Sequence, residues 1–139
     1  IESLPLRMVK HSENGQKLAE FLASHPKVDW VEYPGLPNSS SAALAKKYLK
    51  ACGGVMTFGP KGGRKAAEKL LNSLELAALV IHVADARTGV LHPASTTHRQ
   101  LSDEEQRATG ILPELIRVSV GLEHIDDIIA DFDQALSKI

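Results

Sequence analysis

The sequence predicts a two-layer α+β sandwich, in which helices cover one face of a roughly four-stranded, mainly antiparallel sheet. Three observations indicate this class. Apolar residues recur at helical spacing in several segments, short runs rich in β-branched and aromatic residues separate them, and Gly or Pro marks most junctions. With 139 residues, the chain is long enough for one hydrophobic core and too short for two full domains.

In the N-terminal half, helices alternate with strands. Leu18 and Leu22 share one face of a helix predicted over 7–24. This helix ends before Pro26, because a residue that precedes proline avoids helical geometry. The next elements are a strand over 28–33, a helix over 41–49, a strand over 55–58 and a helix over 64–73.

The C-terminal half contains a long loop. A nearly all-apolar strand is predicted over 79–83, and we expect both of its faces to be covered. Residues 85–101 show little periodicity, so we expect a structured loop, which in a compact domain is usually functional. The last elements are a helix over 102–110 that opens with a capping box, a strand over 115–120, and a helix whose apolar stripe runs from Ile125 to Leu136.

The composition excludes several classes of function. Hydrophobic residues make up 43% of the chain and charged residues 24%, which is ordinary globular composition. A net charge of −1 creates no general attraction for nucleic acid or an anionic membrane. The single cysteine, Cys52, excludes a disulfide-dense secreted scaffold, and no apolar stretch is long enough to span a bilayer. We therefore expect a cytoplasmic protein with no nucleic-acid or membrane partner.

Arg117 is the first candidate for a functional residue. It alternates with apolar residues in the strand over 115–120, a place where arginine is seldom left unpaired. Its planar guanidinium can bind a carboxylate through two parallel hydrogen bonds. The alternative is an internal salt bridge to a nearby acid, which is the more common use of such a residue.

No other residues form a catalytic or metal-binding set. The histidines are scattered, and His92 with His98 does not supply the three or four converging ligands that zinc requires. The segment 59–63 lacks the spacing of a P-loop, and no histidine next to Cys52 marks it as a nucleophile. From the residues alone, the function stays open.

Several motifs resemble the pyridoxal-phosphate (PLP) enzymes of cysteine and methionine metabolism. They are DARTGVLHPASTTH at 85–98, LIRVSVGLE at 115–123, and the shorter matches at 33–36, 53–58 and 61–63. The family includes cystathionine γ-synthase, cystathionine γ-lyase, methionine γ-lyase and O-acetylhomoserine sulfhydrylase, and residues 96–102 are most similar to the last of these. The resemblance covers essentially residues 1–139 and only the C-terminal part of the family's proteins.

The resemblance implies that residues 1–139 are the C-terminal substrate-binding domain of a fold-type I PLP-dependent transferase. The parent enzyme is expected to be a homotetramer that converts O-acetyl-L-homoserine and sulfide or a thiol into L-homocysteine or methionine and acetate. The domain that holds pyridoxal 5′-phosphate on a Schiff-base lysine is expected to lie outside this chain. We therefore expect the chain alone to be inactive, to bind no cofactor, and to self-associate through the face left uncovered.

The resemblance also implies residues that bind the α-carboxylate of an amino-acid substrate. Arg117 matches the arginine that holds this carboxylate, and Thr97 matches a threonine that lines the site. His82 and Val83 fall where the family has serine or asparagine followed by an apolar residue, with the backbone facing the carboxylate. Here the chain departs from the family, since His82 replaces a small polar residue and Ala84 replaces a common glycine.

Two alternatives stay open. The chain could be a domain of a methionine or cystathionine γ-lyase, or of a cystathionine γ-synthase. It could also be a non-catalytic binding or assembly domain, which is favoured if the chain is a complete natural product. The first alternative can be distinguished from an O-acetylhomoserine sulfhydrylase by identifying the products that form from O-acetylhomoserine with and without sulfide.

Overall fold

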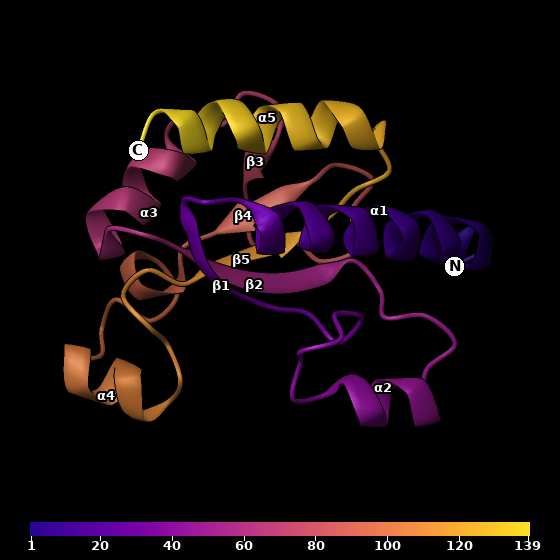
Figure 1. Ribbon diagram of the computed structural model, residues 1–139, viewed down its shortest axis with the longest axis horizontal. Coiled ribbons are helices and arrows are strands. Elements are labelled where there is room, and N and C mark those ends of the chain that lie inside the picture. The colour runs from indigo at the N-terminus through magenta and orange to yellow at the C-terminus, as the bar shows by residue number, and fades with distance from the viewer.

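The computed structural model describes residues 1–139 as helices arranged around one five-stranded sheet (Figure 1). In chain order the elements are α1 (Leu4–Ser24), β1 (Val28–Glu32), α2 (Ala42–Tyr48), β2 (Val55–Pro60), α3 (Gly63–Leu71), β3 (Ala78–Leu79), β4 (Gly89–Leu91), the 3₁₀ helix η1 (Pro93–Ser95), α4 (Asp103–Ala108), β5 (Ile116–Ser119) and α5 (Ile125–Ser137). The predicted α+β class is confirmed, and every predicted helix is present.

The sheet is mixed and has the strand order β1-β2-β5-β4-β3. β2 pairs antiparallel with β1 and β5, β4 pairs antiparallel with β5, and β3 runs parallel to β4. The expectation of four mainly antiparallel strands is therefore wrong. The additional strand, β4, has three residues and lies inside the segment 85–101 that was expected to be a loop. A strand this short shows no period of its own and forms through pairing with distant residues.

The apolar segment 79–83 forms a strand only at its start. β3 ends at Leu79, and the side chains of Leu79, Ile81 and Val83 are 59%, 63% and 56% exposed. The expectation that both faces of this segment are covered is not met within this chain. An apolar run without alternation does not reveal what packs on it.

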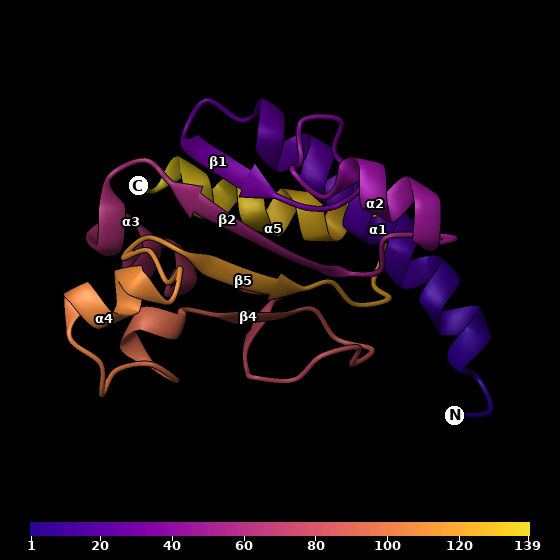
Figure 2. The ribbon, with the colours of Figure 1, turned by 90° about the horizontal axis from the view of Figure 1, so that it is seen from below.

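α1, α3 and α5 form the helical layer on one face of the sheet, and α2 and α4 stand apart from this layer (Figure 2). α1 contacts β1, β2 and α5, and α3 contacts β2 and α5. In β5, the side chains of Ile116 and Val118 are fully buried in the core beneath these helices. Because side chains alternate along a strand, Arg117 and Ser119 project from the opposite face, as the sequence predicts.

Two further observations concern partners. None of the helices combines the length and the apolar character needed to cross a membrane. No group of three or more histidine, cysteine, aspartate or glutamate side chains is arranged to hold a metal ion.

Candidate functional site

Arg117 is half-buried in β5, between Thr57 of β2 and Leu91 of β4. Its Nη2 atom donates a hydrogen bond to the carbonyl of Ile81 at 2.8 Å. The ion pairs of the chain involve other residues, so no aspartate or glutamate lies within 4.0 Å of the guanidinium. The internal salt bridge that was the alternative for Arg117 is absent.

This arrangement suits the guanidinium to a carboxylate from outside the chain. The Ile81 carbonyl restrains the side chain through one of its five N–H groups. The others remain available to form a bidentate pair. An internal acid would compete for these donors, and none is present at ion-pair distance.

The loop that carries Ile81 runs beside β5 and the residues that follow it. The backbone N–H of Ala84 donates to Ser119 Oγ at 3.1 Å, and the N–H of Leu122 donates to the Ala86 carbonyl at 2.8 Å. Ala84 has a φ of 59° and is the one non-glycine residue with a positive φ. The backbone at this position therefore adopts the conformation that favours glycine, which is the common residue here in the family the sequence resembles.

Two buried side chains of α1 bind the segment that follows β5, on the side of the helical layer. His11 Nδ1 donates to the Val120 carbonyl at 2.7 Å, and Asn14 Nδ2 donates to the carbonyls of Gly121 and Glu123 at 3.0 Å each. Neither α1 residue was identified from the sequence. The available signal was a polar side chain at a core-facing helical position, which needs a buried partner.

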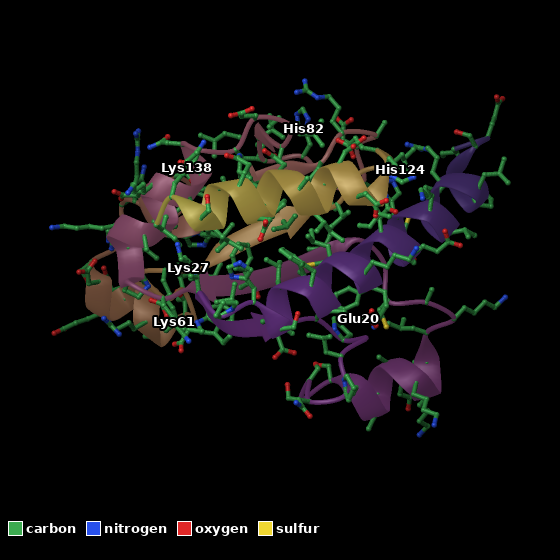
Figure 3. All side chains as sticks on the ribbon, turned by 45° about the horizontal axis from the view of Figure 1, so that its top comes forward. Glu20, Lys27, Lys61, His82, His124 and Lys138 are labelled. Carbon is green, nitrogen blue, oxygen red and sulfur yellow. The ribbon has the colours of Figure 1, made fainter.

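His82 and Asp85 form an exposed pair in the loop after β3. His82 Nδ1 lies 3.3 Å from Asp85 Oδ2, and Figure 3 shows His82 at the rim of the molecule. The backbone N–H of Arg87 donates to Asp85 and is the largest cause that holds the pKa of this carboxyl below its usual value. The contact with His82 acts in the same direction. His82 makes no hydrogen bond to Arg117.

Ile81 is the residue that brings this loop to the guanidinium. It precedes the predicted pair His82 and Val83, and the sequence gives no signal that a main-chain carbonyl would accept from Arg117. Val83 instead lines a hollow of about 140 Å³, together with Ser119 and other residues at this end of the sheet.

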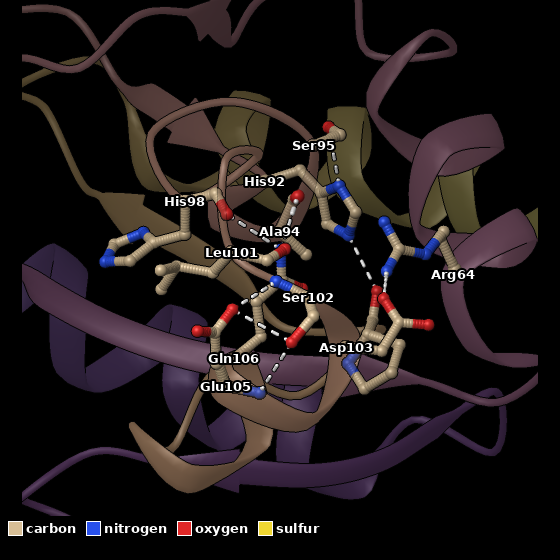
Figure 4. A network of polar contacts seen from close by, with 11 residues as sticks. Arg64, His92, Ala94, Ser95, His98, Leu101, Ser102, Asp103, Glu105 and Gln106 are labelled. Carbon is tan, nitrogen blue, oxygen red and sulfur yellow. Dashed lines mark hydrogen bonds and ion pairs between the residues drawn. The ribbon is translucent and has the colours of Figure 1, made fainter.

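Thr97 lies in a second loop, residues 92–101. Figure 4 shows how Gln106 of α4 holds this loop. Gln106 is buried, and its Nε2 donates to three carbonyls, those of Ala94, His98 and Leu101, at 3.1, 2.8 and 3.3 Å. The Thr97 side chain is exposed, and its hydroxyl lies 2.9 Å from His98 Nδ1. Thr97 makes no hydrogen bond to Arg117.

His92 fixes the start of this second loop (Figure 4). Its Nε2 donates to the Pro113 carbonyl at 2.7 Å, and its Nδ1 accepts from the Ser95 hydroxyl at 2.8 Å. The predicted capping box of Ser102 and Glu105 is present and begins α4. His92 thus serves local hydrogen bonding, since both ring nitrogens are occupied.

The family model for Cys/Met metabolism PLP-dependent enzymes matches residues 1–137. The chain belongs to this family. Homocysteine synthase from Schizosaccharomyces pombe is 56% identical over 137 residues, which are 98% of this chain and 32% of that protein. O-acetyl-L-homoserine sulfhydrylase from Leptospira meyeri is 48% identical over 141 residues, covering 100% of this chain and 32% of that protein. The chain thus spans about a third of the length of these curated relatives.

A solved structure shows the same fold in a longer member of the Cys/Met metabolism group. The crystal structure, described as an O-acetylhomoserine (thiol)-lyase from Campylobacter jejuni, superposes with a TM-score of 0.92 and 40% identity. The match covers 98% of this chain and 32% of that one, which carries N′-pyridoxyl-lysine-5′-monophosphate. This chain therefore corresponds to one part of a PLP-dependent enzyme.

Arg117 and its cross-strand neighbours, Thr57 and Leu91, offer a cation for a carboxylate but no lysine amine that could hold the cofactor of the Cys/Met metabolism family. Lys27, which follows α1, is engaged in other contacts. The Lys27 amine donates to the carbonyls of Leu136, Ser137 and Ile139, at 3.0, 2.8 and 2.8 Å. Lys27 therefore binds the C-terminal end of α5 and is not free to hold a cofactor.

Proposed function

We propose that residues 1–139 are the substrate-binding domain of an O-acetylhomoserine sulfhydrylase. In this reaction sulfide, or a small thiol, displaces acetate from the γ-carbon of O-acetyl-L-homoserine and forms L-homocysteine or methionine. The observation that carries the proposal is Arg117, which has one carbonyl acceptor and no acidic partner. Family membership and the names of the relatives support the type of reaction.

Arg117 binds the α-carboxylate of the amino acid through a bidentate pair and so orients the substrate. Thr97, His82 and Val83 are proposed as further residues near this carboxylate. Support comes from the chain path, because the loops that carry them adjoin β4 and β5. The pyridoxal 5′-phosphate of the family supplies the electron sink for the reaction. It is proposed to bind the remaining two-thirds of the enzyme, so that this chain alone is inactive.

Variants of Arg117 in the full-length enzyme test this proposal. Arg117→Ala is expected to lower kcat/KM for O-acetylhomoserine at least ~10²-fold, because the charge-assisted pair is lost. Arg117→Lys keeps the charge but lacks the planar guanidinium, so its kcat/KM should lie between those of the wild type and Arg117→Ala. Arg107→Ala, an exposed arginine of α4, is the matched control and should stay within about twofold of the wild type. An unchanged kcat/KM in Arg117→Ala would reject the carboxylate-binding role.

Product analysis tests the reaction type. The full-length enzyme is incubated with O-acetylhomoserine in the presence and absence of sulfide. Homocysteine that forms only with sulfide supports the proposed replacement reaction. Ammonia released at the same rate without sulfide indicates a γ-lyase, which is the alternative within the family.

We further propose that the whole enzyme is a cytoplasmic homotetramer and that residues 1–139 alone self-associate. The exposed apolar side chains of Leu79, Ile81 and Val83 support self-association, because apolar patches of this kind usually mark an interface. The free thiol of Cys52 is compatible with a reducing compartment.

A further inference from the structure

Several residues from Arg117 to Glu123 contact the loop between β3 and β4. Arg117 donates to the Ile81 carbonyl, and Ser119 Oγ accepts from the Ala84 N–H. Beyond the end of β5 the Leu122 N–H donates to the Ala86 carbonyl, so the loop is attached to this segment at several points along its length.

Glu123 forms the last attachment by binding Thr88. One carboxylate oxygen, Oε1, accepts from the Thr88 backbone N–H at 2.6 Å, and Oε2 accepts from the Thr88 hydroxyl at 2.9 Å. The Thr88 hydroxyl oxygen in turn accepts from the Gly121 N–H at 2.9 Å. Thr88 is fully buried whereas Glu123 is partly exposed, so the buried hydroxyl and N–H of Thr88 depend on the Glu123 carboxylate for their acceptors.

Gly121 permits the close approach of the two segments. A Cβ at this position would overlap the Glu123 carboxylate and would lie 2.5 Å from both the Ala86 carbonyl oxygen and the Thr88 nitrogen. No side chain fits in this space. The loop and the segment after β5 therefore pack backbone to backbone, with the Glu123 carboxylate between them.

Glu123 acts here as a hydrogen-bond acceptor and not as a member of an ion pair. No lysine, arginine or histidine lies within 4.0 Å of its carboxylate. From the opposite side, Asn14 of α1 donates to the Glu123 carbonyl at 3.0 Å. The residue is thus fixed to the helical layer by its backbone and to the loop by its side chain.

We infer that Glu123 is a positioning residue for the Arg117 site. By holding Thr88, it fixes the loop and with it the Ile81 carbonyl that restrains the guanidinium. Glu123 does not itself touch the substrate. This inference rests on the proposed role of Arg117 in binding a carboxylate.

The test uses the full-length holoenzyme with Glu123→Gln, Thr88→Val and Thr88→Ser. Glu123→Gln replaces one acceptor oxygen with an N–H donor, and Thr88→Val removes the hydroxyl at nearly constant shape. Thr88→Ser keeps the hydroxyl and is the matched control. The measured quantities are kcat and KM for O-acetylhomoserine, the Kd of L-alanine from the change in cofactor absorbance, and Tm.

Glu123→Gln and Thr88→Val are expected to raise KM and the Kd of L-alanine about 10-fold while kcat changes less than about threefold. Thr88→Ser should remain within about twofold of the wild type in both quantities. A purely structural role would lower Tm without this selective loss of amino-acid binding.

Two results would overturn the inference. One is an unchanged Kd of L-alanine in Thr88→Val, whatever its Tm. The other is Thr88→Ser binding as weakly as Thr88→Val. If Glu123→Gln does not fold, the two Thr88 variants decide. Normal binding in Thr88→Val with lost binding in Arg117→Ala rejects only the positioning role, whereas normal binding in Arg117→Ala rejects the proposed function itself.

Discussion

Ala84 combines a side chain with a backbone conformation that disfavours it. Its φ of 59° lies in the left-handed region, which costs a residue with a Cβ about 1–2 kcal/mol. The hydrogen bond from its N–H to Ser119 Oγ, 3.1 Å long, helps to hold this conformation. Since Ala84 lies three residues after Ile81, the strained position belongs to the loop that restrains Arg117.

Ala84→Gly is therefore expected to stabilise the protein. Relief of the strain stabilises the folded state. This gain is partly offset by about 0.4–1 kcal/mol, because glycine raises the conformational entropy of the unfolded chain. The expected net gain in the free energy of unfolding is up to about 1 kcal/mol. Urea unfolding of the chain measures it, with Ala86→Gly, in the same loop at a negative φ, as the control that should lose stability. A loss of stability in Ala84→Gly would contradict the prediction.

Tyr33 is a buried phenol with a strongly raised pKa. Its side chain is fully buried, and its hydroxyl donates to the Gly53 carbonyl at 2.8 Å. Burial is the largest cause that raises the pKa of Tyr33 to about 12, and the nearby Cys52 and Glu20 act in the same direction. The neutral phenol is therefore the form that the folded protein stabilises.

An absorbance titration should show an ionisation step of Tyr33 at about pH 12 that is missing in Tyr33→Phe. Because the folded pKa is higher than the unfolded value of about 10, the associated stability is complete below pH 10. It is lost as the pH rises through the folded value. If Tyr33→Phe leaves the titration near pH 12 unchanged, the assignment of this step to Tyr33 is wrong.

At the scale of secondary-structure elements, Asp131 joins α5 to the segment that follows α3. Its Oδ1 accepts from the Glu75 N–H at 2.8 Å, and its Oδ2 accepts from the N–H groups of Leu76 and Ala77 at 3.1 and 2.9 Å. The residue is 6% exposed. This carboxylate therefore satisfies three backbone donors that no strand partner takes.

Asp131→Asn should lower the free energy of unfolding by about 1.5–3 kcal/mol, because an amide N–H then faces buried donors. Asp127→Asn, on the exposed side of the first turn of α5, is the matched control. It should cost at most about 1 kcal/mol, through the weaker interaction with the helix dipole. Urea unfolding compares the two variants, and equal losses would show that the buried hydrogen bonds of Asp131 contribute nothing specific.

The elements that the sequence predicts well are those whose signal is local. α5 follows from its apolar stripe, and α4 follows from the capping box at Ser102. β4 could not be predicted, because its place depends on pairing with β5 rather than on a period of its own. The candidate site divides in the same way. Arg117 is predicted by strand alternation, whereas Ile81 and Glu123 act through contacts between segments that are distant in the chain.

At the scale of the whole molecule, apolar side chains are exposed on α2, where Leu44 and Tyr48 are more than half exposed, and at two further places. One is the segment 79–83, which begins at the last residue of β3 and in which Leu79, Ile81 and Val83 are more than half exposed. The other is the start of α1, which projects beyond the sheet and exposes Leu6 and Val9 by 79% and 59% (Figures 1 and 2). Relatives about three times as long have further chain that could cover such surfaces.

Sedimentation velocity is expected to show concentration-dependent association of this 15.0 kDa chain. Replacing both Leu79 and Val83 with lysine should weaken the association, because charge on both sides of an apolar contact opposes its burial. Leu44→Lys, on the separate helix α2, is the control and should associate like the wild type. A chain that stays monomeric at every concentration would contradict the proposal of self-association.

The alternation along β5 has a consequence for how this enzyme family can diverge. A shift of the register of β5 by one residue would turn the guanidinium toward the core and expose Ile116 and Val118 to water. No intermediate register exists between these two arrangements. The central strand therefore allows no gradual change in the position of the Arg117 guanidinium. New preferences for the rest of the substrate have to arise in the flanking loops, which can lengthen or exchange residues while the strand stays in place.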